Sequence, residues 1–163
     1  MDKPPLRRGK IFILVAVVLV AVVIVSVLLI DQNREAQIEE QKEAIRHVIP
    51  GISENDLDSL LSRQVYAAYG QIRKGQNLPV TLKAADADLE DQHFFYPDGP
   101  VFGYGINYLG CIMIFLDENA SADRETIDEI YQIIESHANA TGTGNTPVLF
   151  VRAPQIQPDM ETA

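Results

Sequence analysis

The residue types best suited to binding a metal ion lie between positions 86 and 93 of the 163-residue chain. Four carboxylates and a histidine follow one another there at short spacing: Asp86, Asp88, Glu90, Asp91 and His93. Because Ca²⁺ prefers many oxygen ligands, the four carboxylates form a candidate Ca²⁺ site. The usual EF-hand is excluded, since its sixth position would be Asp91 instead of glycine and its twelfth would be Pro97 instead of glutamate. A solvated acidic surface is the alternative interpretation.

The other side chains that could carry chemistry stand alone in the sequence. His47, His93 and His137 lack the spacing of zinc ligands. Cys111 is the only cysteine, which excludes an intramolecular disulfide, and its place at the start of an apolar run is typical of buried packing. No serine lies in a GxSxG elbow. We therefore expect neither enzyme activity nor a cofactor. The alternative is a membrane-tethered, metal-dependent hydrolase that uses residues 86–93.

Aromatic residues gather directly after the acidic stretch. If exposed, they would form an apolar anchor with an acidic rim, which is a candidate contact site for a protein partner: His93, Phe94, Phe95 and Tyr96. Further along, Gly103 and Gly105 are two residues apart and would project to one face of a strand. Such glycines are typical of close packing against a helix or an aromatic ring.

Two tripeptides match the N-glycosylation sequon and bracket a predicted helix. They are Asn119-Ala120-Ser121 and Asn139-Ala140-Thr141. Asn119 and Asn139 are therefore candidate glycosylation sites if this part of the chain lies outside the cytoplasm.

The charge distribution points to a membrane and away from nucleic acid. The chain carries 13 basic and 23 acidic residues, a net charge of −10, with no basic cluster to bind phosphates. Residues 11–30 contain no charged side chain and, at about 1.5 Å rise per residue, are long enough to span a bilayer as one helix. Residues 31–163 hold 9 basic against 22 acidic residues and are strongly acidic. Four basic residues precede the apolar run and predict a cytoplasmic N-terminus: Lys3, Arg7, Arg8 and Lys10.

The leader has a second interpretation. Arg7-Arg8-Gly9 directly before a long apolar helix resembles the prepilin-type signal of type IV pilin-like proteins. The resemblance covers only the leader and the apolar run, and it departs from that family at Lys10, where an apolar residue is usual, and at Leu14, where bacterial pilins carry glutamate. It implies cleavage after Gly9 and assembly into a surface polymer. An uncleaved signal anchor fits the sequence better.

Hydrophobic periodicity predicts an α+β domain over residues 50–152, raised on a helical stalk over 31–49 and followed by a tail over 153–163. In the stalk, Ile38 and Ile45 are seven residues apart, a spacing that would allow a coiled-coil seam between two copies. Helices are expected at 54–70 and 122–138, and strands at 79–82, 101–106, 111–116 and 148–151. We expect the second and third strands to form a hairpin and the last to run parallel to 111–116.

These features together predict a single-pass protein of the cell membrane. Residues 1–10 would be cytoplasmic, residues 11–30 would cross the bilayer, and the α+β domain would lie outside. Its partners would be the lipid bilayer and another protein, not nucleic acid, and the transmembrane helix or stalk could support a homo-oligomer. A non-enzymatic binding or accessory role is the expected function.

Overall fold

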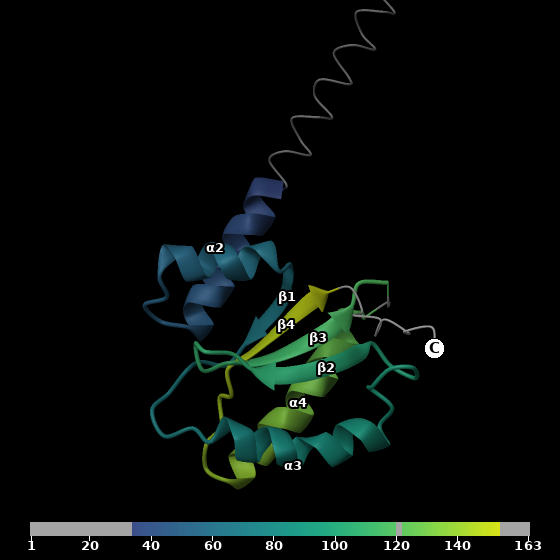
Figure 1. Ribbon diagram of the computed structural model, residues 1–163. Helices are drawn as coiled ribbons and strands as arrows, with labels where there is room; N and C mark the ends of the chain where they lie inside the picture. The colour runs from purple at the N-terminus through teal and green to yellow at the C-terminus, as the bar shows by residue number, and fades with distance from the viewer. Residues whose placement is uncertain (1–33, 120–121, 154–163) are drawn as a thin grey trace, which may run out of the picture. The chain divides into compact units, whose positions relative to one another are not determined.

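The computed structural model describes residues 34–119 and 122–153, which form an α+β fold around one mixed four-stranded sheet. The strands are β1 (Val65–Tyr69), β2 (Val101–Ile106), β3 (Ile112–Asp117) and β4 (Val148–Ala153). They lie in the order β1-β4-β3-β2, so β1 and β2 form the two edges (Figure 1). The central pair β3 and β4 is parallel, and each edge strand is antiparallel to its neighbour.

The two central strands are buried on both faces, which explains why they are almost continuously apolar. Ile112 and Ile114 of β3 face one cluster of core residues, and Met113 between them faces the other. On β4, Phe150 faces the same cluster as Ile112 and Ile114, and Leu149 faces the same cluster as Met113. This alternation follows from the two-residue period of a strand.

The helices α3 (Leu78–Asp91) and α4 (Arg124–Ala140) cover one face of the sheet. The opposite face carries α2 (Glu54–Ser62) and the end of the helical segment 34–48 (Figure 1). Both α2 and α4 start after a residue whose side chain caps the helix. Ser53 caps α2 by accepting from the Asp56 N–H at 3.2 Å, and Asp123 caps α4 by accepting from the Thr126 N–H at 2.9 Å.

Most of the predicted elements are confirmed. The structure contains the expected hairpin of β2 and β3, followed by the expected helix, each within a few residues of the predicted bounds. It also contains the expected parallel pairing of β4 with β3. Two predictions are wrong. The segment 79–82, expected as a strand, begins α3, because Pro79 occupies the first turn of a helix, where a missing N–H costs nothing.

The second error concerns the helix expected over 54–70, which ends at Ser62. Gln64 has φ of +54°, a left-handed conformation that terminates the helix, and the chain re-enters as β1. The apolar spacing of residues 57–68 suits a helix, but Val65 is buried in the sheet by pairing with Val151. Pairing with a distant strand therefore overrides the local pattern.

The packed unit extends further toward the N-terminus than residue 50. The chain divides near residue 40, and Ile45 and Val48 of the helical segment 34–48 are fully buried in the core on the α2 side. Ile45 therefore contributes to the domain itself and is not free to form a seam with a second copy. Ile38 remains 42% exposed.

Several sequence predictions concern residues outside the described part of the chain. They are the apolar run 11–30, its flanking residues Lys3, Arg7, Arg8 and Lys10, Gly9 and the tail after Ala153. Within residues 34–119 and 122–153, no helix combines the length and apolar character that crossing a membrane requires.

Candidate functional site

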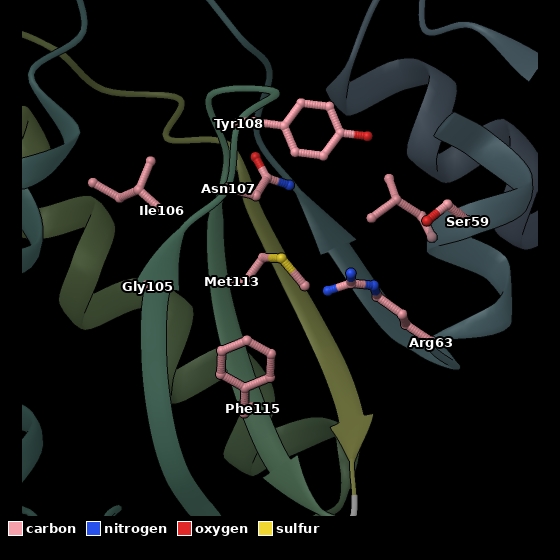
Figure 2. Close-up of a pocket in the computed structure, with 9 residues that line it drawn as sticks. Ser59, Arg63, Gly105, Ile106, Asn107, Tyr108, Met113 and Phe115 are labelled. Carbon is pink, nitrogen blue, oxygen red and sulfur yellow. The ribbon is translucent and has the colours of Figure 1, made fainter. Parts of the chain in front are cut away.

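A groove lies on the α2 side of the sheet, where the helices stop short of the edge strand β2. The core cluster on this side takes residues from β1, β3 and β4 but none from β2. The resulting hollow has a volume of about 280 Å³ and lies between α2 and the β2–β3 hairpin (Figure 2). Among its lining residues are Leu60, Met113 and Phe115, which give it a mainly apolar surface.

The floor of the groove is open because β2 presents glycines there. A Cβ atom on Gly105 would meet nothing within 4 Å, and one on Gly103 would lie 3.9 Å from Phe115 Cδ2, an ordinary contact. The prediction that both glycines face one side of the strand is consistent with this placement. However, only Gly103 has an aromatic ring near its Cβ position, and Gly105 faces empty space.

Four polar side chains line the groove: Ser59 of α2, Arg63, Asn107 and Tyr108. Arg63, just after α2, extends its guanidinium toward Met113 (Figure 2) and forms no ion pair with any described residue. Asn107 accepts from the Cys111 N–H at 2.9 Å through Oδ1, while its buried Nδ2 has no partner among the described residues. Tyr108 is 78% exposed and donates its hydroxyl to Asp56.

Asp56 and Arg63 determine the electrostatics of the groove. At the hairpin end, the hydrogen bond from Tyr108 to Asp56 raises the pKa of the tyrosine. Hydrogen bonds from Ser53 and Tyr108 lower the pKa of Asp56, which is therefore an anion at neutral pH. Arg63, whose side chain extends toward Met113, supplies a permanent positive charge and partly offsets the rise in the pKa of Tyr108. The groove is thus mainly apolar and is lined by one cation, while Asp56 lies outside it, bonded to Tyr108.

The outer edge of β2 adjoins this groove. Val101 forms a single bridge to Phe95, and the backbone N–H of Tyr96 donates to the Val101 carbonyl at 2.8 Å. Beyond Val101, the described residues provide no strand on the outer side of β2. Tyr104 belongs to the opposite face, where its hydroxyl donates to Asp86 of α3.

The predicted Ca²⁺ ligands are not brought together. They lie on or at the end of α3, where the side chains of Asp86 and Asp88 turn to different partners. Asp86 accepts from Tyr104, and Asp88 lies 2.7 Å from His137 Nε2. In the described part of the chain, no three His, Cys, Asp or Glu side chains gather in a way that could hold a metal ion. Glu90 and Asp91 are exposed.

The predicted aromatic contact site is divided by the fold. Phe94 is buried in the core, Phe95 packs against Tyr104, and only His93 and Tyr96 are largely exposed. His93, Phe95 and Tyr96 line a hollow of about 400 Å³ together with acidic side chains. An aromatic contact with an acidic rim there stays a prediction.

The remaining candidates lie where the sequence suggested. Asn119 and Asn139 are both exposed, Asn139 in the last turn of α4. Cys111 is fully buried, and burial raises the pKa of its thiol to about 12, so it is not a reactive nucleophile. The groove itself was missed by sequence reasoning, although the Gly103 and Gly105 spacing was its one local signal.

Comparison of the chain with protein-family models, curated protein sequences and solved structures finds no match in any of the three. Any function must therefore be argued from the sequence and geometry of this chain.

Proposed function

We propose that this chain is a membrane-anchored binding protein, held by residues 11–30, whose α+β domain lies outside the cytoplasm and binds a partner through the groove beside α2. No catalytic step is part of this role. The location is inferred from the sequence, and the geometry of the groove supports the binding role.

The sequence supports the location. Residues 11–30 hold no charge, and the charge changes sign across them, from a net +3 over residues 1–10 to −13 over residues 31–163. Positive flanks favour the cytoplasmic side. An acidic domain is repelled by anionic lipid headgroups and would stand away from the bilayer surface.

The groove is the observation that carries the binding role. When the strands of a sheet are apolar on both faces, a soluble fold normally covers both faces. Here Met113 and Phe115 instead border a hollow. Beside them lies Arg63, which has no acidic partner among the described residues. A concave apolar surface with a few polar groups is typical of a binding site. Arg63 at its rim would set the orientation of what binds.

Cysteine labelling in intact cells tests the location. Because Cys111 is buried, the unmodified chain should react little with a membrane-impermeant maleimide, which gives a low background. Asp58→Cys places a thiol on the exposed side of α2, and Asp2→Cys places one before the apolar run.

We expect the Asp58→Cys chain to be labelled in intact cells and the Asp2→Cys chain only after the cells are permeabilised. Both should stay with the membrane after alkaline extraction. Labelling in the reverse order would place the domain in the cytoplasm, and release by alkali would contradict an integral anchor.

A further inference from the structure

We propose that the groove and the free edge of β2 bind an extended segment of a partner protein, which adds a fifth strand beside β2 and directs an apolar side chain into the groove and a carboxylate to Arg63. This inference rests on the proposed binding role and names the partner's chemistry.

The backbone of β2 is set up for such an addition. The Asn107 N–H donates to the Cys111 carbonyl at 2.9 Å, and hydrogen-bonded pairs alternate along an antiparallel ladder. Gly105, two residues before Asn107, therefore turns its N–H and C=O toward β3, whereas Tyr104 and Ile106 turn theirs to the outside. An exposed strand edge of this kind is a template for one more strand.

The glycines make the groove accessible from that edge. Neighbouring strands lie about 4.8 Å apart, so an apolar side chain on an added strand could lie across the bare backbone of Gly103 and Gly105 and contact Met113. The volume of about 280 Å³ lies at the lower limit of small-molecule sites, which run from about 300 Å³. It suits one or two side chains of a peptide better than a whole ligand.

Charge favours a single carboxylate on the bound segment. Arg63 offers a planar donor set that matches a carboxylate, and no described acid is paired with it. The domain around it is strongly acidic, so a polyanion such as a nucleic acid or an anionic lipid surface would be repelled. An isolated carboxylate, from a side chain or a C-terminus, would gain the attraction with little of that repulsion.

The test uses the full-length chain in detergent and a phage-displayed library of random peptides with free C-termini. Selected peptides are synthesised, and their affinities are measured by fluorescence anisotropy. Gly105→Val adds a side chain to the open floor, where its Cβ atom would meet nothing within 4 Å, and Arg63→Gln removes the cation. Lys74→Gln is the matched control, because it removes one charge from an exposed loop that does not line the groove.

We expect the selected peptides to combine alternating apolar residues with one acidic group. Arg63→Gln should weaken binding by about tenfold or more, the scale of one charge-assisted hydrogen bond, and Lys74→Gln should leave it unchanged. Gly105→Val should abolish binding while the circular dichroism spectrum and unfolding midpoint stay native, which separates occlusion of the groove from misfolding.

Three results would overturn the inference. The first is that the selection enriches no peptide. The second is that the Arg63→Gln chain binds the peptides as tightly as the native chain. The third is that the native chain self-associates and Gly105→Val disrupts this, which would make a second copy the occupant. None of these touches the maleimide experiment. An outside domain without peptide binding would refute this inference alone, and a cytoplasmic domain would refute the proposed function alone.

Discussion

Replacing Gly70 by alanine tests how the loop before β4 is held against the end of β1. Gly70 has φ of +67°, and a Cβ atom there would lie 1.9 Å from the Thr146 carbonyl oxygen and 2.9 Å from that of Asn145. Both contacts are to backbone, so no side chain can rotate away. The loop can move only by losing bonds that fix it, such as those from the Gln71 N–H and Gln76 Nε2 to the Asn145 carbonyl at 3.1 and 3.0 Å.

Three costs combine in this variant. Left-handed backbone on alanine costs about 1 kcal/mol, forced movement of packed atoms about 1–3 kcal/mol, and each lost hydrogen bond about 1 kcal/mol. We therefore expect Gly70→Ala to lower the free energy of unfolding by about 3–5 kcal/mol, a large share of what a domain of this size has.

Gly142→Ala is the matched control for this experiment. Gly142 has φ of +72° but nothing within 4 Å of its Cβ position, so it isolates the backbone cost of about 1 kcal/mol. Urea unfolding of both full-length variants in detergent, followed by circular dichroism, gives the difference. Equal losses in the two variants would refute the close approach of Gly70 to the loop.

Three other predictions follow from buried or partly buried groups. Cys111 should resist iodoacetamide in the folded chain and react promptly in urea, because burial raises the pKa of its thiol to about 12; prompt reaction in the native state would contradict its burial. Burial tends to raise the pKa of Glu135, but hydrogen bonds from the N–H groups of Thr146 and Asn145 outweigh it and lower the pKa below the usual 4.5. The carboxylate thus adds stability above about pH 4.5, and this stability is lost as the pH falls through the lower pKa of the folded state. The urea midpoint of Glu135→Gln should therefore lie below that of the native chain at pH 7, and the difference should be smaller at pH 3. A difference of the same size at both pH values would contradict this. Ile114→Ala should cost about 2–5 kcal/mol of unfolding free energy, whereas Ile38→Ala, at a 42% exposed position, should change little; similar urea midpoints for the two would place Ile114 outside the core.

Sequence reasoning succeeded where local pattern and tertiary environment agree. The apolar run at 111–116 predicted a strand, and the structure places β3 as one of the two central strands of the sheet. The stripe of isoleucines in α4 marked the face that packs on that sheet. In α4 only the helical period fits, and an apolar run as short as 111–116 suits a buried strand better than a helix.

It failed where distant contacts decide. Residues 65–69 carry apolar spacing that suits a helix, and only the pairing of β1 with β4, about eighty positions away, makes them a strand. The sequence left a Ca²⁺ site and a solvated acidic surface both open for the acidic residues of α3, because it does not show that Asp86 meets Tyr104 while Asp88 meets His137. The glycine spacing in β2 was a local signal of the groove, but the groove also depends on where α2 ends over the sheet, which that spacing does not reveal.

Amide hydrogen exchange at β2, resolved residue by residue, tests the groove most directly. The free full-length chain is compared with the chain bound to a selected peptide. Addition of a strand should slow exchange at Tyr104 and Ile106, whose N–H groups face outward, and leave Gly105, which already faces β3, unchanged. Protection that appears elsewhere, or equally on all three residues, would contradict binding at this edge.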